Sequence, residues 1–257
     1  MRLDLYIFDK FLLKSRSFAE NVIKKGKVTV NGATVVKPSF DVTERDIVTV
    51  DTGAEFESLG GDKLEKALDT FKIDLKDKKC VDIGASNGGF TDCMLRRGAK
   101  NVYAVDVAEC AFSEKLLTDK RVFVRDRLNA RYIKPDDVDG LCGFVSVDVS
   151  FISLTLVLKS CFELLDKNGE MIALIKPQFE QGKRGAKSGI VLNPADRLEA
   201  VQRVLAYAAA EDIFCAGLTS APDIFKKKNV EYLAYFVKSP RGGRPVKTLC
   251  IDAFKNL

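Results

Sequence analysis

The feature that most constrains the fold is a glycine-rich turn between a short, largely apolar run and a helical pattern. Residues 80–83 form the run, and residues 81–92 read Val-Asp-Ile-Gly-Ala-Ser-Asn-Gly-Gly-Phe-Thr-Asp. Glycine adopts positive φ readily and lets a ligand approach the backbone closely. The turn has neither the Gly-x-Gly-x-x-Gly spacing of dinucleotide-binding proteins nor the Gly-Lys-Ser/Thr of a P-loop. Two interpretations remain at this point: a turn that binds another cofactor, and an ordinary strand-to-helix turn.

Strand and helix patterns alternate along the chain after this turn. Such alternation predicts an α/β domain whose mostly parallel sheet is covered by helices on both faces. The carboxyl ends of the strands form the edge where such a sheet binds ligands. The expected strands cover residues 80–83, 102–105, 121–124, 144–147, 171–175, 213–218 and 232–237, and the clearest helical patterns between them cover 155–165 and 194–210.

Positive charge is concentrated near the start of the chain. Eight Lys and Arg residues but only three acids fall in residues 1–40, so this segment accounts for the whole net charge of +5. A small basic unit on a neutral body indicates a segment that binds a polyanion. The alternative is a solvated charged face, and charge alone does not separate the two.

Missing residue types exclude several kinds of site. The chain has no histidine, and its seven cysteines include no Cys-x-x-Cys pair, so we expect no metal site. Any general base is therefore a Lys, Asp, Glu or Tyr. The longest apolar stretch, residues 144–158, contains Asp148 and is too short to span a bilayer. Scattered free thiols are typical of a reducing compartment, so we expect a cytoplasmic protein without a membrane partner.

Residues 1–50 form a small unit of their own. Its expected elements are a helix over 18–25 that ends at Gly26, and strands over 28–30, 33–36 and 47–50, the first two joined by an Asn-Gly hairpin turn. In its segments 2–4, 14–16, 24–32 and 37–38 this unit resembles the S4 RNA-binding domain. The resemblance implies that a helix end and a hairpin present basic groups to RNA phosphates. The implied RNA-binding residues are Arg2, Lys14, Arg16, Lys24, Lys25, Lys27 and Asn31.

Charged residues follow four of the expected strands. Asp106 lies about twenty residues beyond the glycine turn, where a carboxylate can accept both hydroxyl hydrogens of a ribose. Asp126 follows the third strand and is placed to reach an adenine. Either acid can instead cap a helix. Asp148 ends the fourth strand and Lys176 the fifth, and for these two a buried ion pair is the alternative to a catalytic role.

Six motifs, at residues 60–68, 81–92, 129–131, 148–154, 175–180 and 229–233, carry a resemblance to a known family. Residues 60–240 resemble the RrmJ/FtsJ-like ribose 2′-O-methyltransferases, and with the S4 unit in front the whole chain resembles the TlyA (hemolysin A) family of ribosomal RNA methyltransferases. The resemblance implies a Rossmann-like α/β fold with a mostly parallel seven-stranded sheet, preceded by a small α+β S4 domain. The implied organisation is an S4-like RNA-binding domain (1–50), a linker (51–61), an S-adenosylmethionine-dependent methyltransferase domain (62–240) and a C-terminal tail (241–257).

The resemblance also implies the site. The family's Lys-Asp-Lys-Glu catalytic set falls on Lys63, Asp148, Lys176 and Glu231. The residues implied to bind S-adenosylmethionine are Asp82, Gly84, Ser86, Gly88, Gly89, Phe90, Thr91, Asp106, Val107, Asp126 and Asp148.

The residue types of the catalytic set suit methyl transfer to a ribose 2′-hydroxyl. This hydroxyl is a poor nucleophile, because it has to lose its proton as it attacks the methyl group. A lysine kept partly neutral can take that proton, and we expect Lys176 to do so. Lys63 would add a second positive charge and help to place the ribose. Asp148 would orient Lys176, and Glu231 would hold a lysine or a ribose hydroxyl.

The expected activity is therefore methyl transfer to ribosomal RNA or ribosomal subunits, with cytidine the target by resemblance. Two departures from the family pattern stand out: Ser-Leu-Gly-Gly at residues 58–61, where the family has Ser-Arg-Gly-Gly, and residues 107–112, where the family has Gly-x-Gly-Gln-Leu. Because the second lies near the expected adenosine, a non-catalytic RNA-binding protein that retains the fold is the main alternative. A membrane-active hemolysin is a further alternative, indicated only by the family's name.

Overall fold

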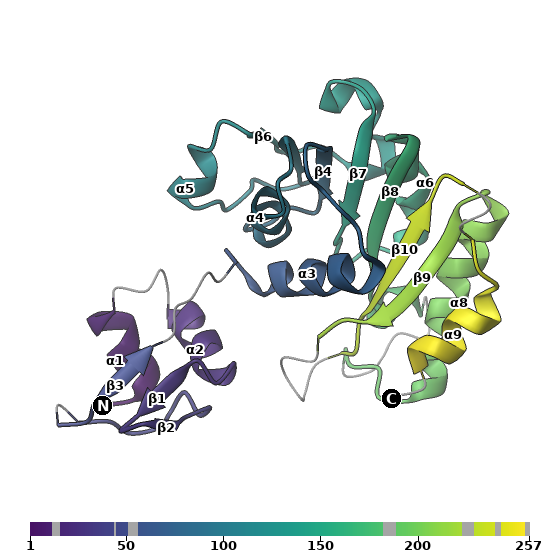
Figure 1. Ribbon diagram of the computed structural model, residues 1–257. Coiled ribbons are helices and arrows are strands. Elements are labelled where there is room, and N and C mark those ends of the chain that lie inside the picture. Colours follow the sequence, from purple (N-terminus) through teal and green to yellow (C-terminus); the bar gives the residue numbers. More distant parts are fainter. Residues whose placement is uncertain are drawn as a thin grey trace. The chain divides into compact units, whose positions relative to one another are not determined.

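The computed structural model describes residues 1–11, 16–43, 45–50, 56–181, 189–222, 229–239 and 243–254. The chain forms two compact units, Met1–Glu55 and Phe56–Leu257 (Figure 1). Each has its own cluster of buried apolar side chains.

The smaller unit packs two helices against a three-stranded antiparallel sheet. Its elements are α1 (Leu3–Lys10), α2 (Arg16–Lys24), β1 (Val28–Val30), β2 (Ala33–Thr34) and β3 (Val48–Val50), with strand order β2-β1-β3. Leu3 and Ile7 of α1 and Val22 and Ile23 of α2 are fully buried in its core. The expected hairpin turn lies between β1 and β2, where Asn31 adopts a positive φ of 53°. Helix α1 was not expected from the sequence.

The larger unit is built on a seven-stranded sheet with the order β6-β5-β4-β7-β8-β10-β9. All neighbouring pairs are parallel except those that β10 makes with β8 and β9. The mostly parallel sheet is thus confirmed. The strands are β4 (Lys79–Ile83), β5 (Asn101–Val105), β6 (Val122–Arg125), β7 (Cys142–Val147), β8 (Leu165–Ile175), β9 (Phe214–Ser220) and β10 (Tyr232–Val237).

The strand order places a topological switch point between β4 and β7. From β4 the chain adds β5 and β6 on one side, and then returns to pair β7 with the other side of β4. The loops at the carboxyl ends of these two strands therefore lead away in opposite directions. A crevice at such a point is where open α/β sheets bind ligands.

Helices cover both faces of this sheet, as Figure 1 shows. They are α3 (Leu59–Phe71), α4 (Gly89–Arg96), α5 (Glu114–Leu117), α6 (Leu158–Glu163), α7 (Pro177–Glu180), α8 (Pro194–Ala210) and α9 (Val246–Phe254), with short 3₁₀ turns η1 (Ala130–Tyr132), η2 (Pro135–Val138) and η3 (Leu154–Leu156). Alternate residues of β4 point to opposite faces. Val81 and Ile83 pack with residues of α6, α8 and α9, while Cys80 packs with residues of α3 and α4.

Three segments differ from the sequence-based expectation. Helix α3 begins at Leu59, within the expected linker of residues 51–61, where the side chain of Ser58 caps it by accepting from the Gly60 amide. The helix expected over 155–165 is divided into η3 and α6, and it ends early because Leu165 already pairs with Cys142 as the start of β8. Residues 241–257, expected as a tail, include α9. Its Leu249 and Cys250 are buried in the same cluster as the sheet residues, and the ring of Phe254 stacks on that of Tyr232 with centroids 4.8 Å apart.

Candidate active site

A cavity of about 430 Å³ lies at the carboxyl ends of the central strands. Seven separate stretches of the chain supply its wall, which is lined by Ser58, Gly60, Lys63, Gly84, Ala85, Ser86, Asn87, Gly89, Phe90, Asp148, Ser150, Lys176, Gln178, Ile190, Ala221, Pro222, Asn229, Val230 and Glu231. All four residues of the expected catalytic set are among them. The fold thus brings together side chains that are up to 168 positions apart in the sequence.

The catalytic set forms two ion pairs. Lys176 Nζ lies 2.6 Å from Asp148 Oδ1 and donates a hydrogen bond of 2.8 Å to Ser150 Oγ. Lys63 Nζ donates to Glu231 Oε2 at 2.6 Å. The four side chains are between 10% and 22% exposed, so each positive charge is largely removed from water and lies beside a carboxylate. Glu231 therefore holds a lysine, which is one of the two roles expected for it.

The loop of Asp148 is placed by the glycine turn. The Asp148 amide donates to the carbonyl of Ile83 at the end of β4, at 2.8 Å. Gly84 follows with φ +83°, and a Cβ at this position would lie 2.4 Å from the carbonyl oxygen of Asp148. Gly88 has φ +86°, and a Cβ there would lie 2.3 Å from a methyl carbon of Leu116. At these two positions glycine is needed for close contact between parts of the protein itself.

Two of the expected cofactor residues, Asp82 and Thr91, lie beneath the turn and not in the cavity wall. Both are fully buried, and the Asp82 carboxylate accepts hydrogen bonds from Thr91 Oγ1 at 2.7 Å and Ser146 Oγ at 2.8 Å. Burial raises the pKa of Asp82 to about 6, although these hydrogen bonds act in the opposite direction. Asp82 thus joins β4, β7 and α4 behind the site.

The residues expected to contact the adenosine secure the loop of residues 107–112. Asp106 accepts from the amides of Ser86 and Ala108, both at 2.9 Å. Asp126 accepts from the amide of Cys110 at 2.8 Å. Val107 is exposed, and none of Asp106, Val107 and Asp126 belongs to the cavity wall. The loop that departs from the family pattern is therefore tied to the glycine turn at one end and to β6 at the other.

A buried carboxylate connects the loops of Asp148 and Lys176. Glu180, at the end of α7, accepts from Ser153 Oγ at 2.6 Å and from the Leu154 amide at 2.7 Å. Burial raises the pKa of Glu180. Phe151, two residues before Ser153, has a φ of +62° and is 92% exposed, and the centroid of its ring lies 5.2 Å from that of Phe179. A left-handed conformation costs a bulky residue about 1–3 kcal/mol, so the surrounding contacts hold this loop in place.

The polar residues of the cavity wall that were not expected from the sequence include Ser150, Gln178 and Asn229. Asn229 accepts from the Val191 amide at 2.7 Å and donates to the Gly189 carbonyl at 2.8 Å, which holds residues 189–191 beside the cavity. All three lie within or next to motifs of the expected family, at residues 148–154, 175–180 and 229–233. The motifs were thus the available signal, although they did not single out these positions.

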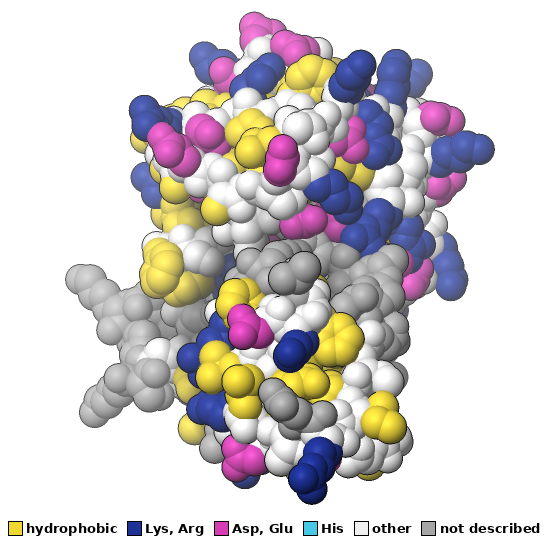
Figure 2. All heavy atoms as spheres, turned by 90° about the vertical axis from the view of Figure 1, so that its left-hand side faces the viewer, with side chains coloured by type: hydrophobic (Ala, Val, Ile, Leu, Met, Phe, Trp, Pro, Cys, Tyr) yellow, Lys and Arg dark blue, Asp and Glu magenta, His cyan; other side chains and the backbone are white. Residues whose placement is uncertain are grey.

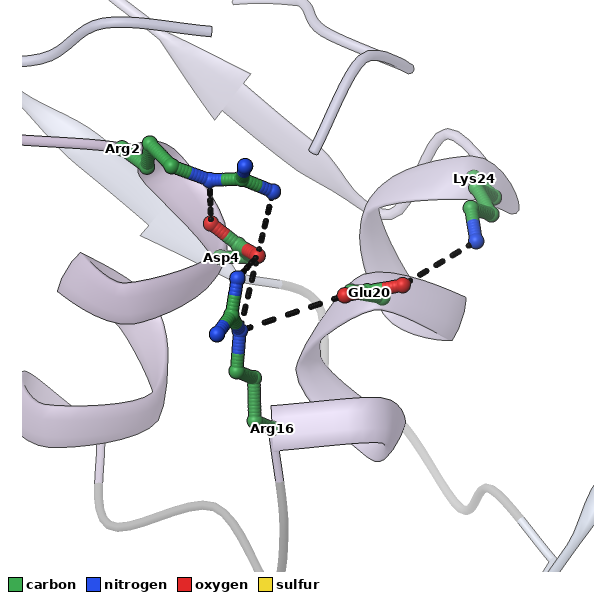
Figure 3. Close-up of polar contacts among 5 residues, drawn as sticks. All are labelled: Arg2, Asp4, Arg16, Glu20 and Lys24. Carbon is green, nitrogen blue, oxygen red and sulfur yellow. Dashed lines mark hydrogen bonds and ion pairs between the residues drawn. The ribbon is translucent and has the colours of Figure 1, made fainter. Parts of the chain in front are cut away.

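In the smaller unit, two of the expected RNA-binding residues share one buried anchor. Arg2 donates to both carboxylate oxygens of Asp4 at 2.9 and 3.0 Å, and Arg16 donates to Asp4 Oδ2 at 3.0 Å (Figure 3). Lys24 donates to Glu20 at 3.2 Å. Burial acts to raise the pKa of Asp4, but hydrogen bonds from Arg2 and Arg16 outweigh it and leave this pKa below its usual value. The two guanidinium groups are about half exposed and held together.

Three more of the expected RNA-binding residues, Lys25, Lys27 and Asn31, lie just before or within the β1–β2 hairpin. Lys25 and Lys27 belong to the turn between α2 and β1. Asn31 donates to Asp46 at 2.8 Å and accepts from the Ile47 amide at 2.9 Å, so its side chain fixes the hairpin. Lys14 lies outside the described residues. So does the side chain of Leu59, which stands in the Ser-Leu-Gly-Gly motif where the family has arginine. On the face drawn in Figure 2, basic side chains are interspersed with acidic and hydrophobic ones.

Comparison with known proteins identifies two domains. Residues 56–238 match the model of the FtsJ-like methyltransferases, and residues 1–48 match the S4 domain. A protein of Mycobacterium tuberculosis named 16S/23S rRNA (cytidine-2′-O)-methyltransferase TlyA is 36% identical over 91% of this chain and 88% of its own length. Hemolysin A of Brachyspira hyodysenteriae is 38% identical over 92% of this chain and all of its own length.

A solved structure of a hemolysin-like protein from Streptococcus thermophilus is similar over both units. It is 35% identical, with a TM-score of 0.74, and the match covers 99% of this chain and 96% of that chain. A related structure from Lactococcus lactis is 40% identical, with a TM-score of 0.72 over 78% of this chain and 99% of that chain. Within the described residues, no helix is long and apolar enough to cross a membrane.

Proposed function

The chain belongs to the TlyA (hemolysin A) family of FtsJ-like methyltransferases with an S4 domain, and from this we propose that it transfers a methyl group from S-adenosylmethionine to a ribose 2′-hydroxyl of ribosomal RNA. One observation carries the proposal. Lys176 Nζ lies in the cavity wall, 2.6 Å from Asp148 and hydrogen-bonded to Ser150, while Lys63 and Glu231 form a second pair in the same wall.

The cavity residues fit S-adenosylmethionine. A volume of about 430 Å³ suits a small-molecule site. Asp148 Oδ1 is buried and, besides its ion pair with Lys176, accepts no hydrogen bond within the described residues, so its carboxylate can also attract a positively charged ligand. We assign Gly84, Ser86, Gly89 and Phe90 to contact the cofactor. Asp106, Val107 and Asp126 would contact its adenosine, because the two acids retain lone pairs beyond the amides they already bind.

The remaining cofactor residues of the sequence-based prediction would act indirectly. Asp82 and Thr91 support the turn from below, and Gly88 gives Leu116 the space to pack against it. When bound, S-adenosylmethionine supplies a methyl group on a positively charged sulfur, which leaves as a neutral thioether as the ribose oxygen takes the methyl.

The chain's own residues would bind the ribose and remove its proton. Lys176, as the neutral amine, takes the hydroxyl proton as the oxygen attacks, and the resulting ammonium later releases that proton to solvent. The Asp148 carboxylate stabilises this ammonium at 2.6 Å. Lys63 is held by Glu231 and would place the ribose, and alignment of the reacting atoms would supply the rest of the acceleration.

The S4 unit would supply affinity for RNA. Arg2 and Arg16 form a guanidinium pair suited to phosphate, and Lys24, Lys25 and Lys27 follow at the end of α2. The proposed substrate is ribosomal RNA within a ribosomal subunit, with a cytidine as the target nucleotide because that is the base in the names of the relatives. All seven cysteines are free, which suits a reducing compartment, and the cytoplasm is the proposed location.

A non-catalytic RNA-binding protein that retains the fold is the second candidate, and residues 107–112 are the observation that favours it. Calorimetric titration with S-adenosylmethionine separates the two candidates. We expect saturable binding at one site, whereas absence of binding would favour the non-catalytic protein.

Mapping of 2′-O-methyl groups on ribosomal RNA tests the activity itself. RNA from cells with and without this protein is compared, and we expect at least one cytidine methyl group to be lost in its absence. An identical pattern in the two samples contradicts the proposed function.

A further inference from the structure

The catalytic lysine contacts two groups of the same loop, and only one of them fixes its direction. Lys176 Nζ donates a hydrogen bond of 2.8 Å to Ser150 Oγ. Asp148 Oδ1 lies closer, at 2.6 Å, but accepts no hydrogen bond from any described residue. An ion pair attracts without a strong angular preference, whereas a hydrogen bond prefers a nearly linear donor. Asp148 therefore sets the charge beside Nζ, and Ser150 sets its orientation.

The surrounding loop fixes the position of Ser150, although the side chain of this residue borders the cavity. Glu180 binds both Ser153 and Leu154, so that the end of the loop is attached to α7 only four residues after Lys176. Phe151, directly after Ser150, adopts a φ of +62° and contacts Phe179 of α7. These contacts join the loop to α7 close to the hydrogen bond between Ser150 and Lys176.

The protonation state of the amine gives this orientation a consequence. A lysine ammonium has three N–H donors, whereas the neutral amine has two N–H donors and one lone pair. In the neutral state, Ser150 accepts one N–H and Asp148 attracts the other. The lone pair is then left at the remaining tetrahedral position.

We propose that Ser150 is a positioning residue for Lys176, which aims the lone pair of its neutral amine at the ribose 2′-hydroxyl. This rests on the proposed function, because it assigns a partner to the base of that reaction. The hydroxyl of Ser150 does not itself gain or lose a proton. It lies in the wall of the cavity beside Asp148 and Lys176 and acts on the reaction through Lys176.

The test uses the full chain with ribosomal RNA, and it compares the variants Ser150→Ala and Ser150→Thr. Turnover at saturating substrate, the KM for RNA and the Kd for S-adenosylmethionine are measured for each. We expect Ser150→Ala to lower kcat at least about 10-fold, a part of the roughly 10²- to 10⁴-fold that a positioned base contributes. The KM and the Kd stay near their wild-type values, and Ser150→Thr restores most of kcat because it restores the hydroxyl. Ser160→Ala is the matched control, because Ser160 Oγ binds the Ala130 carbonyl away from the cavity.

Three results would overturn the positioning role: full kcat in Ser150→Ala, loss of kcat together with cofactor binding, or no recovery in Ser150→Thr. A wild-type protein that binds S-adenosylmethionine but methylates no ribosomal RNA contradicts the proposed function instead.

Discussion

Asp82→Asn is expected to change how stability depends on pH, because Asp82 is a buried carboxylate whose hydrogen bonds among the described residues come from hydroxyl groups and not from a cation. Burial raises its pKa from the ordinary 3.8 to about 6, so the folded protein binds this proton more tightly than the unfolded chain. The stabilisation is fully present below the unfolded pKa of about 3.9 and is lost as pH rises through about 6. One pH unit in a pKa is worth about 1.4 kcal/mol, which gives about 3 kcal/mol in total.

Asparagine stays neutral and retains the geometry of the site. Its oxygen can accept from Thr91, and its amide can donate to the hydroxyl of Ser146, which rotates to accept. The free energy of unfolding of Asp82→Asn relative to wild type should therefore rise by about 3 kcal/mol from acid to neutral pH, mostly between about pH 4 and pH 6. Urea titrations followed by far-ultraviolet circular dichroism measure this difference.

Asp4→Asn is the control of opposite sign. Hydrogen bonds from Arg2 and Arg16 leave the pKa of Asp4 below its usual value, so its stabilisation is present at neutral pH and is lost as pH falls through the lowered pKa. Asp4→Asn should be less stable than wild type at neutral pH, and this difference should shrink in acid. A difference between Asp82→Asn and wild type that does not vary with pH refutes the reasoning for Asp82.

Two further pairs of variants test the packing around the site. Gly84→Ala and Gly140→Ala both place a side chain at positive φ, which costs about 1–2 kcal/mol of stability. Only the Gly84 variant adds a backbone clash, so thermal unfolding should show a loss of stability about 1–3 kcal/mol larger for Gly84→Ala than for Gly140→Ala. Equal losses in the two variants would contradict the clash. Tyr232→Phe should be neutral or stabilising, because its buried hydroxyl has no hydrogen-bond partner among the described residues. Tyr235→Phe should cost about 1.5–3 kcal/mol of stability because it removes a hydrogen bond to the Glu170 carboxylate. Chemical denaturation measures the stability of both variants, and a larger loss in Tyr232→Phe than in Tyr235→Phe would contradict this difference in hydrogen bonding.

The elements that the sequence predicts best are those with an uninterrupted pattern. Residues 194–210 carry a helical pattern that begins at a proline, and α8 has these same bounds. Helix α1 was missed because its apolar residues do not lie on one face: Leu3 and Ile7 are buried, whereas Leu5 and Phe8 are exposed. The end of α6 was missed because pairing with β7, and not local preference, makes Leu165 the start of a strand.

The site shows the same division between local pattern and tertiary contact. Motifs predicted Lys63, Asp148, Lys176 and Glu231, and the structure places all four in one cavity, while their individual roles stay predictions. Motifs did not predict that Ser150 accepts from Lys176, because this contact depends on how two loops pack together.

In the smaller unit, the sequence predicts the charge but not which charged groups pair. Residues 1–40 contain eight basic residues, but Arg2 and Arg16 both bind the carboxylate of Asp4. In the sequence, Asp4 is only one charge among many. Its complete burial, which makes it an anchor for two guanidinium groups, becomes visible only in the fold.

The proposed removal of the ribose 2′-hydroxyl proton by Lys176 is tested by transfer of labelled methyl from S-adenosylmethionine to ribosomal RNA. Lys176→Met is compared with Lys78→Met, since Lys78 also lies 2.6 Å from a carboxylate, that of Glu170, but is not part of the cavity wall. We expect Lys176→Met to bind the cofactor and to lose at least about 100-fold in turnover, while Lys78→Met keeps wild-type turnover and methylates the 2′-oxygen. Undiminished transfer by Lys176→Met, or an equal loss in both variants, would contradict the claim.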